Sequence, residues 1–387
     1  MDPAEREGLR LKGNVPNLRF PEFQGEWKES TIGEMFDLYS GNTPSRLNKE
    51  HFKGTVNWIS SGELKEHYIY SSKEQISEEA TKSLKLLPVG TFVIAIYGLE
   101  AEGVRGTGSI IQEPSTISQA CMSFIPKGVI ENEFLYSWYK KHGNVIGIRY
   151  AQGTKQQNLS YDILEKFRIA YPNTKEQEKL NKFISLLDER IATQNKIIDK
   201  LQTLIKGISS RIFASIQGIE YRMGDIVTIT NGNSNVQDAV TQSKDGLYPF
   251  FDRSEDIKYL PTFLFDKEAI IYPGEGTEFM PRYFKGKFAL HQRCYAIFDF
   301  NEIINARFLY FYLKTRNSYF VKNAVGSTVP SLRLDTFQKL KVIIPSKKIQ
   351  HSVSLCLSSM EQKCNVEKKI LHKLLKQKQY LLRQMFI

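Results

Sequence analysis

The sequence predicts an α+β protein with a pseudo-two-fold internal repeat, in which two long helices that pair as a coiled coil separate two mixed α/β domains. Three observations predict this fold class. Residues 153–213 recur without a gap as residues 326–386. Each copy ends in a long apolar seam of heptad period, and the segments between the helices hold apolar runs separated by Gly, Pro and Asn. An internal repeat determines the architecture before any local element is assigned.

The repeat keeps a constant offset of 173 residues (326 minus 153). Similarity with gaps extends upstream, where Ile117–Cys121 aligns with Leu290–Cys294. The first globular segment is longer than the second by about 18 residues, as expected for loops that carry different specificities on one scaffold. We predict a leader or disordered arm at 1–13, globular domains at 14–152 and 218–325, and repeat regions with a long helix at 153–217 and 326–387.

The helix of each copy carries a seam in which spacings of four and three residues alternate, typical of a helix that pairs with another helix. Gln194 and Glu367 interrupt it at equivalent positions. An amphipathic helix on a globular core is the alternative, but its stripe would drift from a strict heptad, and no drift is visible. About 38 residues would make a rod of roughly 57 Å. The predicted seam residues are Leu180, Ile184, Leu187, Ile191, Ile198, Leu201, Ile205, Ile208, Val353, Leu357, Met360, Leu371, Leu374 and Leu381.

Both globular domains are predicted to mix strands and short helices. Gly90–Tyr97 and Ala269–Pro273 read as buried strands, and Glu133–Lys141 and Ala306–Thr315 as short helices. No apolar run reaches the length of a membrane span and no signal peptide is recognisable, so we expect a soluble, cytoplasmic protein without a membrane partner.

Four cysteines are present, without a CxxC pair or a nearby Cys/His pair. Buried free thiols are therefore expected, rather than a metal site or disulfides. Six histidines show no metal-ligand spacing, so no metal site is predicted.

The net charge of +11 suggests a polyanionic partner. The excess lies mostly in the helices, above all in residues 346–387, and both globular domains are nearly neutral. A solvated basic helix face explains the charge equally well. Nucleic-acid binding by the globular domains would thus require local basic clusters.

Short motifs follow one another in a fixed order: Asn14–Phe23, Gly41–Ser45, Trp58–Leu64, Gln157–Leu159, Ile169–Pro172, Glu176-Gln177 and Leu186–Asp188. Together with the alternation of globular domain and repeated helix, they resemble the specificity (S) subunit of type I restriction–modification systems over residues 15–387. The second copy departs from this pattern, with Pro330-Ser331 in place of Gln157-Asn158 and Ile349 in place of Glu176. The role of that polar loop in the second half is thereby left open.

The resemblance implies two target-recognition domains, each reading one half of a bipartite double-stranded DNA site, and helices that pair antiparallel. It also implies that two methyltransferase (M) subunits and nuclease–translocase (R) subunits join the chain, which is itself non-catalytic. S-adenosylmethionine, ATP and Mg would then be bound by the partners. The sequence agrees, since it lacks both a Pro-Pro methyltransferase motif and a GxxxxGK[ST] loop.

Within the recognition domains, Arg and Lys could bind guanine edges or phosphates, and Asn and Gln adenine edges. Gln119 and Gln292 are equivalent, and for them we expect a structural hydrogen bond. Two other functions stay open: a coiled-coil scaffold whose globular ends bind proteins, and an enzyme whose site one sequence does not reveal. The candidate DNA-binding residues are Arg46, Lys49, Lys53, Arg105, Lys155, Gln156, Lys244, Arg253, Arg282, Lys285, Lys287, Arg293 and Arg333.

Overall fold

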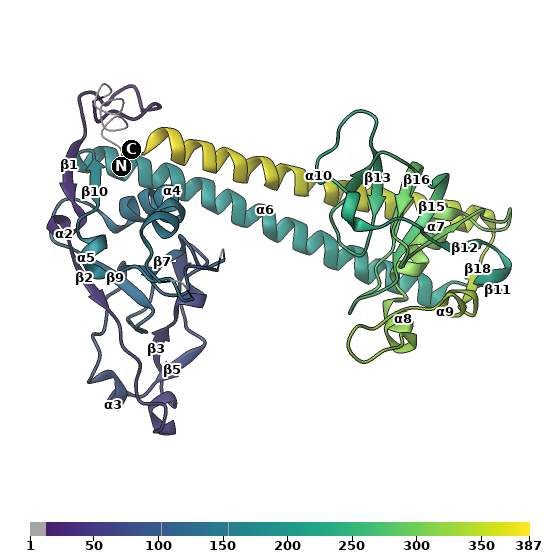
Figure 1. The fold of residues 1–387 in the computed structure, drawn as a ribbon, viewed down its shortest axis with the longest axis horizontal. Helices are drawn as coiled ribbons and strands as arrows, with labels where there is room; N and C mark the ends of the chain where they lie inside the picture. The colour runs from purple at the N-terminus through teal and green to yellow at the C-terminus, as the bar shows by residue number, and fades with distance from the viewer. Residues whose placement is uncertain (1–12, 102, 154) are drawn as a thin grey trace. The chain divides into compact units, whose positions relative to one another are not determined.

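The structure, a computed structural model, describes residues 13–101, 103–153 and 155–387. The predicted arm at 1–13 lies outside these residues except for its last position. Two compact units are formed, one by the chain up to Thr193 together with Leu371–Ile387, and the other by Gln194–Ile370. Each long helix therefore contributes to both units (Figure 1).

The long helices are α6 (Thr174–Ser215) and α10 (Lys347–Met385), close to the predicted length. Pro172 precedes α6, and the Asn173 side chain caps it by accepting a hydrogen bond from Glu176 N at 3.1 Å. In the first unit the start of α6 packs beside the end of α10. In the second unit the end of α6 packs beside the start of α10. The two helices thus run antiparallel within each unit (Figure 1).

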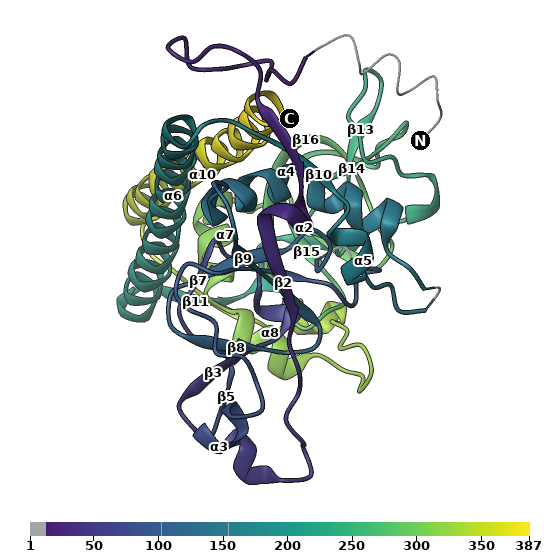
Figure 2. The same ribbon diagram turned by 90° about the vertical axis from the view of Figure 1, so that its left-hand side faces the viewer.

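The first unit contains three sheets, with strand orders β1-β10, β2-β9-β6-β7-β4 and β5-β3-β8 (Figure 2). Its strands are β1 (Lys28–Thr31), β2 (Phe36–Ser40), β3 (Val56–Ile59), β4 (Tyr68–Ile69), β5 (Glu74–Ile76), β6 (Phe92–Ala95), β7 (Gly108–Ile111), β8 (Ser115–Ile117), β9 (Cys121–Pro126) and β10 (Arg168–Tyr171). Its shorter helices are α2 (Ile32–Met35), α3 (Glu78–Thr81), α4 (Asn132–Tyr150) and α5 (Tyr161–Leu164).

The second unit contains a six-stranded sheet of order β12-β17-β15-β16-β13-β14 and the pair β11-β18. Its strands are β11 (Ile219–Arg222), β12 (Thr228–Asn231), β13 (Tyr248–Phe251), β14 (Lys258–Leu260), β15 (Phe265–Pro273), β16 (Arg282–Leu290), β17 (Cys294–Phe298) and β18 (Lys341–Ile344). Its shorter helices are α7 (Ala306–Lys314), α8 (Asn317–Asn323) and α9 (Leu334–Gln338).

The two units share one strand arrangement, with a single break. β3 pairs with β8 in parallel through Ile59 and Ile117, as β13 pairs with β16 through Phe251 and Leu290. The long strand β16 corresponds to β7 and β8 of the first unit, which the segment 112–114 separates. This segment ends in a proline, which has no N–H to donate to a ladder. The first unit therefore has two sheets where the second has one.

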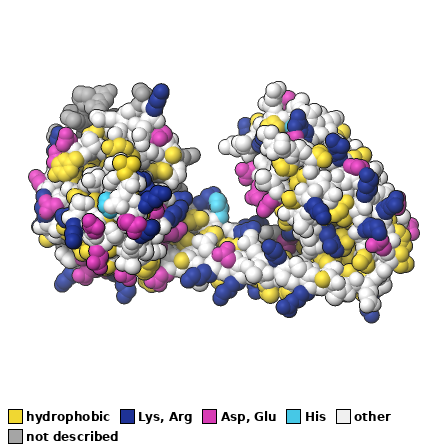
Figure 3. Space-filling model, turned by 90° about the horizontal axis from the view of Figure 1, so that it is seen from below, with side chains coloured by type: hydrophobic (Ala, Val, Ile, Leu, Met, Phe, Trp, Pro, Cys, Tyr) yellow, Lys and Arg dark blue, Asp and Glu magenta, His cyan; other side chains and the backbone are white. Residues whose placement is uncertain are grey.

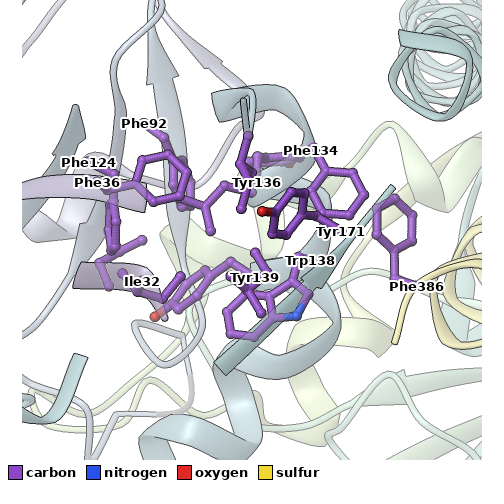
Figure 4. Packing of buried hydrophobic residues seen from close by; sticks show 14 of the residues in the cluster. Ile32, Phe36, Phe92, Phe124, Phe134, Tyr136, Trp138, Tyr139, Tyr171 and Phe386 are labelled. Atoms are coloured by element: carbon purple, nitrogen blue, oxygen red, sulfur yellow. The ribbon is translucent and has the colours of Figure 1, made fainter. Parts of the chain in front are cut away.

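Helix α4 packs on the five-stranded sheet of the first unit. It supplies aromatic residues to the core of this unit, which also receives Phe386 from the end of the chain (Figure 4). The helix is longer than the predicted Glu133–Lys141. Gly143 and Gly147, poor helix formers in isolation, continue it because they allow close packing. A Cβ at Gly143 would lie 3.0 Å from Gly106 Cα. In the second unit, α7 lies within one residue of the predicted segment.

Three of the four cysteines are buried, as expected, but Cys356 is exposed on α10. It stands one position before the buried seam residue Leu357, on the outer face of the helix. Burial raises the pKa of the Cys121 thiol to about 12 and that of Cys294 to about 11.

One buried glutamine anchors each repeat. Gln177 donates from Nε2 to Val129 O and Pro172 O, both at 3.0 Å, and accepts from Glu131 N at 3.0 Å. Its equivalent, Gln350, makes the same three bonds. Gln350 donates to Ile303 O (2.8 Å) and Pro345 O (2.9 Å) and accepts from Asn305 N (2.7 Å). The start of each long helix is thereby bound to the loop before α4 or α7.

The neighbouring residue explains one departure between the copies. Glu176, 1 % exposed, pairs with Arg19 at 2.7 Å and accepts from Trp27 Nε1 at 3.3 Å. Both partners belong to the segment before β1. The Glu176 carboxylate of the first copy therefore binds the segment before β1. In the second copy the equivalent residue, Ile349, faces solvent.

Candidate nucleic-acid interface

Three loops meet at one end of the first globular domain. Asn42 N donates to Ile117 O at 3.1 Å, and Ser118 N donates to Ile59 O at 2.9 Å. A Cβ at Gly41 would lie 2.0 Å from the Ile117 carbonyl oxygen, so only glycine fits there. We call the loops 41–45, 59–63 and 117–121 the first tip.

The second domain repeats this geometry at equivalent positions. Ser234 N donates to Leu290 O at 3.1 Å, and His291 N donates to Phe251 O at 2.9 Å. A Cβ at Gly232 would again lie 2.0 Å from a carbonyl oxygen, that of Leu290. The loops 232–236, 251–255 and 290–294 form the second tip. The same backbone frame thus carries different side chains in the two domains.

Arg46 follows the first tip on an exposed loop. Its guanidinium makes two hydrogen bonds to the Glu74 carboxylate, at 2.9 and 2.8 Å, and its Cζ lies 4.5 Å from the centroid of the Phe52 ring. The bond to Glu74 raises the pKa of Arg46. The neighbouring Leu47 is 98 % exposed. Arg46 is therefore held in one orientation, next to an apolar side chain in full contact with solvent.

Several predicted residues lie on exposed loops. Gly153 and Gly326, at φ 109° and 102°, open equivalent loops. The loops close in the same way, because Asn158 N donates to Gln152 O at 2.9 Å and Ser331 N to Val325 O at 2.8 Å. The polar loop thus keeps its backbone pairing in the second copy despite the changed side chains. Lys155 and Gln156 are exposed in the first of these loops, and Arg333 is exposed just after the second. Lys49 and Lys53 are exposed in the segment after the first tip.

Two predicted residues instead support the fold. Arg105 is half-buried, and its Nε donates to Leu99 O at 2.9 Å. Arg282 donates to backbone carbonyls within 252–255, including Ser254 O at 2.9 Å. Burial lowers the pKa of Arg282. Because these guanidinium groups donate to their own domains, Arg105 and Arg282 contribute to the fold, and their part in DNA binding stays a prediction.

The other candidate basic residues of the second domain are exposed. Arg293, in the second tip, forms an ion pair with Glu275. The Lys287 ammonium lies 4.8 Å from the centroid of the Phe263 ring. On the face shown in Figure 3, Lys and Arg are interspersed with Asp and Glu. The basic residues on this face therefore form small groups and not one continuous basic surface. The exposed set is Lys244, Arg253, Lys285, Lys287 and Arg293.

The side chains of Gln119 and Gln292 do not make the expected structural hydrogen bonds within the described residues. The main chain supplies them instead. Ser40 Oγ donates to Gln119 O at 3.4 Å, and Asn231 Nδ2 donates to Gln292 O at 3.3 Å. Both glutamines are exposed at the tips.

All fourteen predicted seam residues are buried or half-buried in the helix pair. The two polar residues that interrupt the seam, Gln194 and Glu367, contact each other. Gln194 Nε2 donates to the Glu367 carboxylate at 2.6 Å and to Glu367 O at 3.2 Å. Equivalent residues that contact each other in this way make the local two-fold relation of the helices visible.

Sequence reasoning missed a charged cluster in the first unit. His67 lies between the rings of Tyr68 and Tyr136, with ring centroids 4.0 and 3.9 Å away. Its Nε2 is 2.9 Å from Glu133, and its Nδ1 is 3.3 Å from Asp188. The second contact is an ion pair without hydrogen-bond alignment. The elements of this cluster are distant in sequence, so no local pattern could have indicated it.

Two further properties concern the described residues only. Within 13–101, 103–153 and 155–387, no group of three or more His, Cys, Asp or Glu side chains is arranged to hold a metal ion. None of the helices described is both long enough and apolar enough to cross a membrane.

Comparison with known proteins agrees with this architecture. A chain from Methanocaldococcus jannaschii, the type I restriction enzyme MjaIX specificity subunit, is 24% identical, and the match covers 89% of each chain. The EcoR124I/EcoR124II specificity subunit of Escherichia coli is 32% identical over 48% of this chain and 45% of its own length. The solved S subunit of a type I restriction–modification system from M. genitalium matches with a TM-score of 0.64 at 18% identity, over 96% of this chain and 99% of that one.

The family described as the type I restriction modification DNA specificity domain matches this chain twice, at residues 24–203 and 219–376. The two matches correspond to the two copies of the internal repeat. The chain therefore belongs to the specificity-subunit family of type I restriction–modification systems.

Proposed function

We propose that the chain reads a bipartite, asymmetric double-stranded DNA site, with each half read by one recognition domain. The observation that carries this proposal is the repeated tip. Its backbone frame is the same in both domains, but Ser60-Ser61 in the first stands where the second has Asp252-Arg253. A pseudo-two-fold protein can place two readers on two half-sites, and readers with different side chains need not read the same bases.

The exposed basic residues near the tips would mainly bind phosphates and fix the register on DNA, with fewer contacts to base edges. Arg46 and Arg293 are both paired with carboxylates in the free chain. Both side chains of the Arg46–Glu74 pair are exposed, and such pairs contribute little to stability. DNA could therefore take the Arg46 guanidinium from Glu74 at small cost.

The proposal includes a complex with two methyltransferase (M) subunits and with nuclease–translocase (R) subunits. S-adenosylmethionine, ATP and Mg would belong to those partners, and this chain would supply recognition without catalysis. The helices α6 and α10 would act as a ruler for the unread spacer, since about 40 helical residues extend roughly 60 Å. Insertion of one heptad into both helices should then lengthen the spacer.

The test is co-expression of the chain with the methyltransferase subunit encoded beside it, followed by mapping of methylated adenines over the host DNA. We expect a bipartite motif with a spacer of fixed length that disappears when this chain is left out. A stable complex that produces no such motif would contradict the proposal and would favour the scaffold alternative.

A further inference from the structure

Gln119 and Gln292 occupy the same position in the two tips. Each lies in the turn before β9 or β17, two residues before the buried Cys121 or Cys294. Each turn is fixed by its main chain, because its carbonyl oxygen accepts a side-chain hydrogen bond from the end of β2 or β12. The turns that carry the two side chains are therefore held by equivalent contacts.

The amide groups of both glutamines are exposed, and in the part of the chain that the structure describes they have no hydrogen-bond partner. A shared asparagine pair at the tips, Asn42 and Asn233, differs in this respect. Asn42 Oδ1 accepts from Thr43 N at 2.8 Å, and Asn233 Oδ1 accepts from Ser234 Oγ at 3.2 Å. The shared asparagines thus serve their own loops, whereas the shared glutamines are available to a ligand.

The residues around the two glutamines differ between the domains. Ala120 follows Gln119, but Arg293 follows Gln292. Ser118 precedes the first, and His291 precedes the second. In two readers of different sequences, a free side chain that is identical in both is suited to a feature that the two half-sites share. Its variable neighbours are suited to the features that differ.

We propose that Gln119 and Gln292 each bind the major-groove edge of one adenine, at corresponding positions of the two half-sites. A glutamine amide matches this edge, since its carbonyl oxygen accepts from adenine N6 while its NH₂ donates to N7. This inference rests on the proposed function, and it assigns to each half-site one A·T pair read by the same chemistry.

The experiment uses the complete complex of the chain with its methyltransferase and compares the methylation motifs of wild type, Gln119→Leu and Gln292→Leu. Leucine keeps much of the side-chain volume but removes both hydrogen bonds. We expect each variant to relax one adenine position in one half-site and to leave the other half unchanged. Discrimination at that position should fall about tenfold to a hundredfold, the range for one bidentate contact. Gln217→Leu, at an exposed glutamine after α6, is the matched control.

A second pair of variants, Gln119→Glu and Gln292→Glu, keeps the residues polar and covers the case in which leucine prevents folding. Glutamate only accepts hydrogen bonds and suits cytosine N4, so preference at the same position should shift away from adenine. A motif that stays unchanged in all four variants would overturn the inference. So would uniformly weaker methylation with the same motif, which indicates a phosphate contact. If the wild-type complex itself gives no bipartite motif, the proposed function fails instead.

Discussion

The two globular domains contact the long helices at equivalent places with different chemistry. In the first unit, Asp188 of α6 pairs with His67 from the recognition domain and with Lys378 of α10. Its equivalent in the second unit is Glu361 of α10, which binds Lys314 at 2.8 Å. Glu361 also accepts from Tyr310 Oη at 2.7 Å. Both copies thus place a carboxylate at this point of the helix.

The acid on the globular domain, unlike the one on the helix, is not kept. Glu133 of α4 pairs with His67 in the first unit. The second unit has Arg307 at that position of α7, and its guanidinium lies 3.6 Å from the centroid of the Tyr283 ring. The glutamine contacts to backbone, by contrast, are the same in both units. Backbone partners impose one geometry, but an ion pair can be replaced by any other arrangement that leaves no buried charge alone.

The largest effect is expected where the two units agree. Gln177→Ala and Gln350→Ala each remove three hydrogen bonds of a buried side chain and leave two carbonyls and one N–H without their partner. Each should lower the free energy of unfolding by about 3 kcal/mol. Urea unfolding, with hydrogen exchange of peptides from the affected unit, measures this. Gln202→Ala, at an exposed position of α6, should have almost no effect. Clearly unequal losses in the two units would contradict the equivalence.

A smaller and unequal effect is expected where the units differ. Asp188→Asn weakens contacts to two basic groups, His67 and Lys378, and should cost about 2 kcal/mol. Glu361→Gln affects only one, Lys314, and keeps an acceptor for Tyr310, so about 1 kcal/mol is expected. These figures are reduced because the side chains are partly exposed. Chemical unfolding of the two isosteric variants tests this difference. A larger loss of free energy of unfolding for Glu361→Gln than for Asp188→Asn would contradict the expectation.

The first unit should also respond to pH through His67. Burial alone would lower the pKa of His67, but its contacts with Asp188 and Glu133 outweigh burial and raise it. The protonated imidazole therefore stabilises the fold fully below its ordinary pKa, and this contribution is lost as the pH rises through the raised value. The melting temperature of wild type minus that of His67→Gln should fall between about pH 5.5 and about pH 7.5.

The pH comparison stops there because another group begins to titrate. Burial, followed by the charge of Lys378, lowers the pKa of Lys140 to about 8. Its effect on stability has the opposite sign, since a lowered pKa makes the folded state more stable as the pH rises. If the difference in melting temperature between wild type and His67→Gln does not change from about pH 5.5 to about pH 7.5, His67 carries no extra proton in the folded state.

The smallest effect is expected at the seam, where the two repeats meet at Gln194 and Glu367. Replacing both with leucine should change the free energy of unfolding by less than about 1 kcal/mol, because a paired polar contact is exchanged for an apolar one. Gln194→Leu alone should cost more, since Glu367 then faces an apolar side chain. Thermal unfolding of the wild type and the two variants decides this, and a double variant less stable than the single one would contradict it.

The fold was predictable where it depends on local pattern. Heptad spacing and the prolines at 172 and 345 located both helices, and the constant offset related the two units. Periodicity does not encode tertiary packing. It could not indicate that β7 and β8 are separate strands, divided by a segment that ends in Pro114, or that α4 continues past Gly143. The structural roles of Arg105 and Arg282 were hidden for the same reason. A basic residue that donates to its own backbone looks, in sequence, like one that is free to bind DNA.

The cluster around His67 was out of reach because it joins positions more than a hundred residues apart, such as His67 and Asp188. Equivalent positions also carry different residue types, so the repeat alignment gave no hint. The free amides of Gln119 and Gln292 show the converse. Their equivalence was visible in the sequence, but only the structure showed that both residues are exposed and that their amides make no hydrogen bond within the described residues.

The central claim is that two independent readers share one frame, and a domain exchange tests it most directly. Residues 219–325 would be replaced by the corresponding domain of another family member, and the methylation motif of the complex with its methyltransferase would be mapped again. The account predicts that one half of the DNA site changes while the other half and the spacer stay the same. A change in both halves would contradict it.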